Sequence, residues 1–142
     1  AIIFISLIVI DQYIKWLFVD GYENQLGCIY FYLVYNKGVA FSMFEFLGEY
    51  LKYIQIAILC ALFIYIWNNE LMLKHLKLPM SFIFAGGVSN IIDRFYRVGV
   101  VDFVAWKCYF DFAIFNTADI FINIGVFLAI IIVFKNKELL ES

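Results

Sequence analysis

The first 19 residues read AIIFISLIVIDQYIKWLFV, an apolar run in which Asp11 and Lys15 are the only charges. A helix of this length, at about 1.5 Å per residue, crosses most of a hydrocarbon core about 30 Å thick. We therefore expect a first membrane span over residues 1–19. Asp11 and Lys15 are four positions apart, so they share one helix face and can form an ion pair. That pair either has a structural role or belongs to a functional site.

The composition places the whole chain in a bilayer. Of its 142 residues, 65% are hydrophobic, 21% are aromatic and only 15% are charged, which is more apolar surface than a soluble domain of this size buries. The strict alternation of a transmembrane barrel is absent, so the spans should be helices. The net charge is −2 and no basic run is present, so nothing indicates nucleic-acid binding.

Three further apolar runs predict spans at residues 50–67, 79–92 and 113–134. The small residues at 85–89 should let another helix approach closely. Glycine-rich, charged segments at 20–49 and 93–112 predict excursions outside the membrane. We therefore predict a single integral-membrane domain over residues 1–142, an all-α membrane protein with four transmembrane helices.

Parts of the two excursions favour extended structure. Residues 28–35 are β-branched and aromatic, which indicates a short strand. Residues 36–38 carry a turn signal, interpreted either as a hairpin turn at the membrane surface or as part of the site. Residues 100–105 are also extended in pattern, so a strand or loop should present Asp102 near the surface.

The cysteines and the single histidine suggest no metal or nucleophile chemistry. Cys28, Cys60 and Cys108 are scattered without metal-site spacing, and we expect them to be free thiols in apolar surroundings. His75 lies in a polar link among lysines, away from the carboxylates. The chain starts at Ala1 without a cleavage site after its first span, so we expect that span to be retained and a few native residues to precede it.

Two carboxylates stand out in the second half of the chain, Asp102 and Asp119. An ionised carboxylate is costly in low-dielectric surroundings, so such residues in a membrane protein indicate a site by default. Asn116, Asp119 and Asn123 form a polar stripe on the last span at helical spacing. Asn90 and Arg94 share a face at the end of the third span.

Two carboxyl groups a few Å apart share a proton, because both cannot ionise cheaply. An ionised Asp can then activate water while a protonated one polarises a peptide carbonyl, with neither metal nor cofactor. A proton-coupled transporter also uses intramembrane carboxylates. In a structural or pore-forming subunit, the acids would merely pair with Arg94 and Lys15. The residues by themselves leave these three classes open.

Four blocks of the sequence together resemble the lipoprotein signal peptidases, the signal peptidase II family of bacterial inner membranes. The first-span block is Asp11-Gln12-x-x-Lys15, and the periplasmic block is Tyr35-Asn36-x-Gly38-x-Ala40-Phe41-Ser42. The two blocks that carry the family's catalytic aspartates resemble Asn90-x-x-Asp93-Arg94 with Gly99-x-Val101-Asp102-Phe103, and Phe115-Asn116-x-Ala118-Asp119. Their order on four spans makes the resemblance specific.

The resemblance implies a role for each matching residue. Asp102 and Asp119 would be the catalytic pair. The substrate-binding set would be Asp11, Asn36, Asn90, Arg94 and Asn116, and the structural support would be Lys15, Gly38 and Asp93, with Lys15 holding Asp11 in place. Ser89 replaces a glycine usual in the family, from which we expect slightly looser helix packing.

The resemblance also implies a membrane aspartyl endopeptidase that cuts prolipoproteins just before the diacylglyceryl-modified cysteine of the lipobox. The enzyme would act as a monomer in contact with membrane lipid, without a cofactor or a metal. It would lie in the bacterial cytoplasmic membrane with its termini inside. Its site would face the periplasm under a small β-cradle and a short interfacial helix drawn from residues 20–51.

Overall fold

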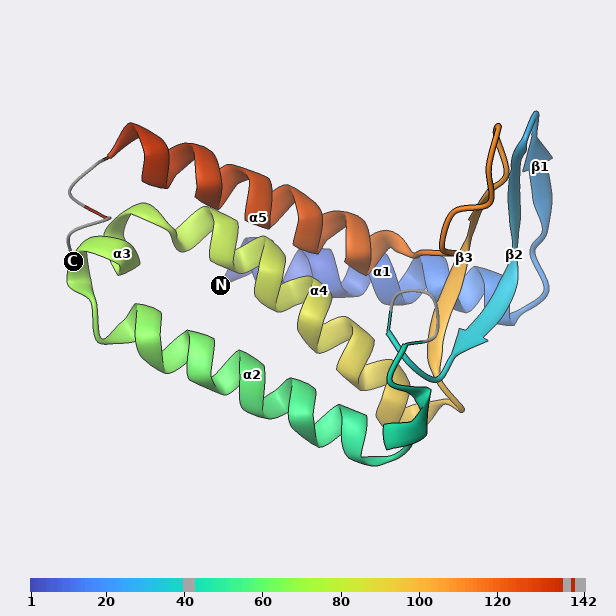
Figure 1. Ribbon diagram of the computed structural model, residues 1–142, viewed down its shortest axis with the longest axis horizontal. Helices are drawn as coiled ribbons and strands as arrows, with labels where there is room; N and C mark the ends of the chain where they lie inside the picture. The colour runs from blue at the N-terminus through green and yellow to red at the C-terminus, as the bar shows by residue number, and fades with distance from the viewer. Residues whose placement is uncertain (40–42, 137–138, 140–142) are drawn as a thin grey trace.

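The computed structural model describes residues 1–39, 43–136 and 139, so positions 40–42 of the predicted periplasmic block lie outside the described residues. Helices run lengthwise and a small sheet stands at one end, with both chain termini toward the other end (Figure 1). In chain order the elements are α1 (Ile2–Val19), β1 (Asn24–Leu26), β2 (Ile29–Asn36), the 3-10 helix η2 (Glu45–Leu47), α2 (Tyr50–Trp67), α3 (Glu70–His75), α4 (Lys77–Tyr96), β3 (Val100–Trp106) and α5 (Thr117–Lys135).

Within the described residues, three helices are long and apolar enough to cross a membrane: α1, α2 and α5. They coincide with the apolar runs predicted as spans at 1–19, 50–67 and 113–134, although α5 begins only at Thr117 because Asn116 caps it. The third predicted span, 79–92, lies within the longer helix α4 but is not among the three candidates. Helix α4 is less apolar than these three helices, because it combines small and polar residues with charges at both ends.

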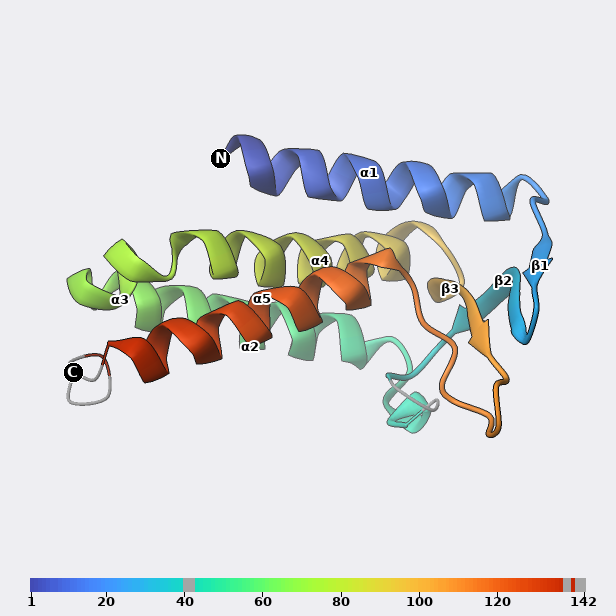
Figure 2. The same ribbon diagram turned by 90° about the horizontal axis from the view of Figure 1, so that it is seen from above.

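Helix α4 is the centre of the bundle. It packs against α1, α2 and α5, and it lies between α1 and α2 when seen from above (Figure 2). Gly86 faces α5, where a Cβ would lie 2.4 Å from the carbonyl oxygen of Ala118, whereas the adjacent Gly87 faces Leu59 of α2. The close approach predicted for residues 85–89 is therefore confirmed, and glycine is required at position 86 because the neighbour is backbone.

The two excursions build one antiparallel sheet in the order β1-β2-β3. Strand β2 confirms the extended segment predicted at 28–35, and β3 confirms the one at 100–105. The hairpin lies between β1 and β2, where Gly27 has a positive φ of 61°. Residues 36–38 instead end β2 in a turn in which the Gly38 amide donates to Asn36 Oδ1 at 2.9 Å. The cradle thus draws its third strand from the second excursion.

The prediction of three free thiols is wrong for two of them. Cys28 and Cys108 form a disulfide with Cα atoms 5.1 Å apart, whereas Cys60 is free and exposed. The strand register explains this pairing, because Ile29 lies opposite Trp106 and the Lys107 amide donates to the Cys28 carbonyl at 3.0 Å. The disulfide therefore joins the ends of two segments that the sheet has already brought together.

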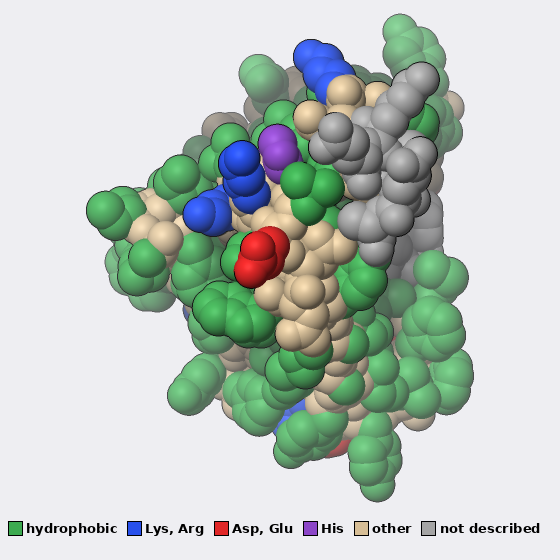
Figure 3. All heavy atoms as spheres, turned by 90° about the vertical axis from the view of Figure 1, so that its left-hand side faces the viewer, with side chains coloured by type: hydrophobic (Ala, Val, Ile, Leu, Met, Phe, Trp, Pro, Cys, Tyr) green, Lys and Arg blue, Asp and Glu red, His purple; other side chains and the backbone are tan. Residues whose placement is uncertain are grey.

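The end of the bundle remote from the sheet carries a cluster of basic side chains. Figure 3 shows lysines gathered around the single histidine on this face. The short helix α3 and the start of α4 supply Lys74, His75 and Lys77 there. Helix α3 was not predicted; Asn69 begins it, because its side chain accepts a hydrogen bond from the Met72 amide.

The packing of α4 on α5 makes a prediction about two adjacent glycines. Gly86→Ala should lower the free energy of unfolding by about 1–3 kcal/mol, because the new methyl group meets the Ala118 backbone. Gly87→Ala is the matched control, since its nearest neighbour at 2.9 Å is the flexible end of Leu59. Denaturation in detergent micelles measures both, and equal stability of the two variants would contradict this account.

Candidate functional site

Asp102 and Asp119 meet where β3 passes the start of α5. Asp102 lies in the middle of β3 and is only 3% exposed. Asp119 lies in the first turn of α5, held by a reciprocal capping box: the Asp119 amide donates to Asn116 Oδ1 at 2.9 Å, and the Asn116 amide donates to Asp119 Oδ2 at 3.0 Å. The start of the helix therefore fixes the orientation of this carboxylate.

Side-chain amides fix the remaining carboxylate oxygens. Asn36 Nδ2 donates to Asp102 Oδ2 at 3.0 Å, and Asn116 Nδ2 donates to Asp102 Oδ1 at 2.8 Å. Asn90 Nδ2 donates to Asp119 Oδ1 at 3.0 Å. Asn116 thus contacts both acids, and each of the four carboxylate oxygens accepts a hydrogen bond. The two carboxyl groups are held as one unit in one cavity.

The surroundings of Asp102 favour its protonated form. Burial, and to a smaller extent the nearby charge of Asp119, raises the pKa of Asp102 to about 7. The hydrogen bonds from Asn36 and Asn116 act in the opposite direction and lower this pKa. Near neutral pH the Asp102 carboxyl group can therefore both hold and release a proton, as a general acid must.

A buried ion cluster lies behind the pair. Lys15 Nζ lies 2.7 Å from Asp11 Oδ2 and 2.7 Å from Asp93 Oδ2, and all three side chains are fully buried. The same ammonium group donates to Asn90 Oδ1 at 2.9 Å. Asn90 Oδ1 also accepts from Asn116 Nδ2 at 3.1 Å. With two donors on its oxygen, the Asn90 amide must turn its nitrogen toward Asp119.

Ser89 strengthens this cluster. Its hydroxyl donates to Asp11 Oδ2 at 2.6 Å and accepts from Gln12 Nε2 at 2.8 Å, and the residue is fully buried. Gln12 Nε2 also donates to Asp93 Oδ1 at 3.0 Å. Asp93 forms a further ion pair with Arg97. The hydroxymethyl group thus adds a bond between α1 and α4 at the position where we expected looser packing.

Arg94 lines the cavity beside the two acids. Its guanidinium group donates to the carbonyl oxygens of Gly38 and Asn90, the latter at 3.4 Å. Its Nε atom is buried and has no hydrogen-bond partner among the described residues. Gly38 is itself buried, so its backbone anchors Arg94. Asp11 and Lys15 do not line the cavity, because they lie behind Asn90.

The cavity has a volume of about 360 Å³ and is walled by α2, α4, α5, the strands and residues 112–115. It contains two amides that we did not assign to the site, Gln55 of α2 and Asn123 of α5. Both had a sequence signal. Gln55 is the single amide in the apolar helix α2, and Asn123 belongs to the polar stripe that begins at Asn116.

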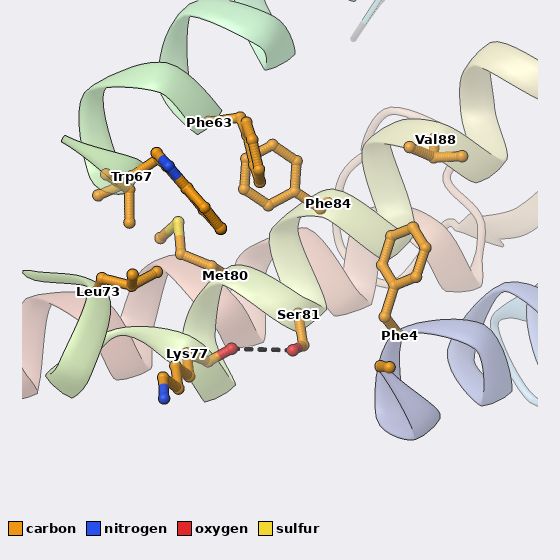
Figure 4. Close-up of a pocket in the computed structure, with 11 residues that line it drawn as sticks. Phe4, Phe63, Trp67, Leu73, Lys77, Met80, Ser81, Phe84 and Val88 are labelled. Atoms are coloured by element: carbon orange, nitrogen blue, oxygen red, sulfur yellow. Dashed lines mark hydrogen bonds between the residues drawn. The ribbon is translucent and has the colours of Figure 1, made fainter.

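A different cavity, of about 480 Å³, lies toward the opposite end of the bundle (Figure 4). Its walls are mainly apolar and aromatic, among them Phe63, Trp67 and Phe84. The Ser81 hydroxyl donates to the Lys77 backbone carbonyl at 2.8 Å, as the dashed line shows. No carboxylate of the described residues lines this cavity, so the cavity at the sheet end is the candidate for acid–base chemistry.

Comparison with known proteins agrees with this geometry. The family model described as signal peptidase (SPase) II matches residues 3–135. A lipoprotein signal peptidase of Sulfurimonas denitrificans is 49% identical over 133 residues, covering 93% of this chain and 85% of the relative. A lipoprotein signal peptidase of Helicobacter pylori is 40% identical over 138 residues, covering 96% of this chain and 88% of the relative. A solved bacterial membrane enzyme superposes with a TM-score of 0.81 at 28% identity, covering 96% of this chain and 87% of the other.

Apolar helices with two acids in one cavity under a small sheet define a membrane protein with a candidate acid–base site. The match over nearly the whole chain makes the assignment specific: the protein belongs to the signal peptidase II family. Membership in a peptidase family favours hydrolysis over the transporter and the structural-subunit interpretations.

The buried ion cluster predicts a stability effect for Lys15. Lys15→Met should lower the free energy of unfolding by about 3–5 kcal/mol, because it leaves the buried Asp11 carboxylate without a cation and Asp93 with Arg97 alone. Lys37→Met, at an exposed lysine, should change it by less than about 0.5 kcal/mol. Unfolding in micelles measures both variants, and a Lys15→Met protein as stable as the control would show that the cluster contributes little.

Proposed function

We propose that this protein is an aspartyl endopeptidase that removes signal peptides from prolipoproteins, cutting just before the diacylglyceryl-modified cysteine. The observation that carries this proposal is the arrangement of Asp102 and Asp119, which share the Asn116 side chain at the edge of one cavity. The relatives named lipoprotein signal peptidases support the substrate class.

The different surroundings of the two acids assign their roles. Asp119, at the positive end of the α5 dipole, is the ionised member that takes a proton from water as its oxygen attacks the carbonyl carbon. Asp102, protonated, hydrogen bonds to the carbonyl oxygen and polarises it. When the C–N bond breaks, the Asp102 proton passes to the leaving nitrogen. Transfer of the proton from Asp119 to Asp102 restores the pair.

The remaining site residues position the substrate and the acids. Arg94 offers its buried Nε to a substrate carbonyl. Asn36, Asn90 and Asn116 hold the carboxylates, and through them the attacking water. Asp11, Lys15 and Asp93 act from behind Asn90, while Gly38 holds Arg94. One chain supplies all these groups, so a monomer suffices.

The membrane arrangement follows from where the polar groups lie. We propose that α4 also crosses the bilayer, shielded by the three helices around it, so that it needs less apolar surface than they do. The sheet and the acids then face the periplasm of a bacterial cytoplasmic membrane. The termini and the cluster at Lys74 and Lys77 then face the cytoplasm. Family membership supports this orientation, because basic residues are about equally frequent on the two sides. A diacylglyceryl substrate, itself a lipid, can reach the cavity laterally between α2 and α5.

Replacing either acid tests this proposal directly. Asp102→Asn and Asp119→Asn should each lower the rate of prolipoprotein cleavage by about 10³-fold or more while the protein stays folded, since each removes an acid–base group. The assay is cleavage of a purified diacylglyceryl prolipoprotein in micelles with EDTA present. Retained turnover in either variant would refute the pair, and substrate-coupled proton flux in liposomes would point to a transporter.

The raised pKa of Asp102 predicts a pH profile. Because Asp102 must be protonated, kcat/KM should fall as the pH rises through about 7. Asn36→Ala removes a hydrogen bond that lowers the pKa of Asp102, so the variant's descending limb should move to higher pH. A pH–rate series on both proteins checks the direction, and a limb that moved to lower pH would reverse the assignment.

A further inference from the structure

Two amide side chains in the site cavity have no partner. Gln55 Oε1 is buried without a hydrogen bond to any described residue. Asn123 is exposed in the protein by itself and makes no side-chain hydrogen bond within the part of the chain that the structure describes. Each lies on a helix apolar enough to cross a membrane. An unpaired amide is costly in such surroundings, so both groups are suited to pairing with a ligand.

Their position relates them to the scissile bond. Asn123 follows Asp119 by four residues, so it lies on the same face of α5 and about 6 Å further along the helix. Gln55 comes from α2, so α2 and α5 each supply one amide to the same cavity. A distance of about 6 Å corresponds to about two residues of extended chain.

At this depth the proposed substrate has backbone groups that lack hydrogen-bond partners. A signal peptide that lies in hydrocarbon as a helix pairs its backbone groups internally. A protease must free the scissile carbonyl from that helix, which also leaves neighbouring N–H and C=O groups without partners. A primary amide matches a peptide group, since it carries both donors and an acceptor. A charged residue or an aliphatic side chain would not offer both.

We propose that Gln55 and Asn123 form a backbone-binding subsite for the unwound end of the signal peptide, about two residues before the scissile bond. Gln55 Oε1 accepts a hydrogen bond from a substrate N–H, and the Asn123 amide pairs with a substrate carbonyl. Arg94 Nε adds a donor nearer the acids. This inference rests on the proposed peptidase function and names the part of the substrate that the cavity recognises.

Apolar replacements of similar size test the subsite. Gln55→Leu and Asn123→Leu should each lower kcat/KM for a diacylglyceryl lipobox peptide by about tenfold, the effect of one lost hydrogen bond. Asn68→Leu is the matched control, because Asn68 is an exposed amide at the far end of α2. Leucine suits a membrane helix, and thermal unfolding in micelles verifies that all variants fold.

A substrate change separates recognition from a structural role. An ester replaces in turn the amide bond at the first, second and third residues before the scissile bond, which removes one N–H each time. For the wild-type protein, the ester at one of these positions, near the second, should lower kcat/KM about tenfold relative to the all-amide peptide. For Gln55→Leu, the ester at that position should not lower kcat/KM below the value for the all-amide peptide. An ester placed deep in the signal-peptide helix should affect both proteins equally.

The outcomes are distinct. Equal losses in wild type and Gln55→Leu at every ester position would overturn the subsite, and would leave Gln55 and Asn123 bridged by water. Full activity of both leucine variants would overturn it as well. Failure of the wild-type protein to cut the all-amide peptide would instead refute the peptidase function, and the subsite with it.

Discussion

The contact on which the rest of the structure depends is the burial of Lys15 between Asp11 and Asp93. Its ammonium group lies 2.7 Å from both carboxylates, with no exposed surface on any of the three side chains. Such a cluster is tolerable only when every charge is compensated. Because Asp11 and Lys15 belong to α1 and Asp93 to α4, compensation requires these two helices to lie together in one register. The cluster therefore sets the position of the central helix.

The geometry of the site depends on the register between α1 and α4. Lys15 and Asn116 both donate to Asn90 Oδ1, so the Asn90 nitrogen must point at Asp119. Asn116 in turn starts α5 and reaches Asp102 on β3. A single chain of hydrogen bonds thus runs from the interior of α1 to both acids. The side-chain oxygen and nitrogen atoms of Asn90 and Asn116 are all hydrogen-bonded, and satisfied polar networks of this kind hold their members rigidly.

The helices and strands themselves were predictable from the sequence. Contacts between them were predictable only where residue spacing or small residues implied them. The apolar runs located three membrane helices, and the residues around 28–35 and 100–105 located two strands. The disulfide was not foreseen, because Cys28 and Cys108 meet only through the register of β2 with β3. Gln55 was missed for a similar reason: it is the single amide of its helix, and only the packing of α2 on α4 brings it to the cavity.

The sequence by itself determined the membrane class and the family resemblance, and it singled out the two acids of the candidate site, because hydropathy, helical spacing and motif order can be read from the linear sequence. The tertiary structure decided which groups surround Asp102, and with them its raised pKa, since burial and the charge of Asp119 depend on segments far apart in sequence. It also decided that Asp11 and Lys15 act from behind Asn90 and not from the cavity wall. Helix spacing places two side chains on one face, but only the packing of α1 on α4 determines what that face meets.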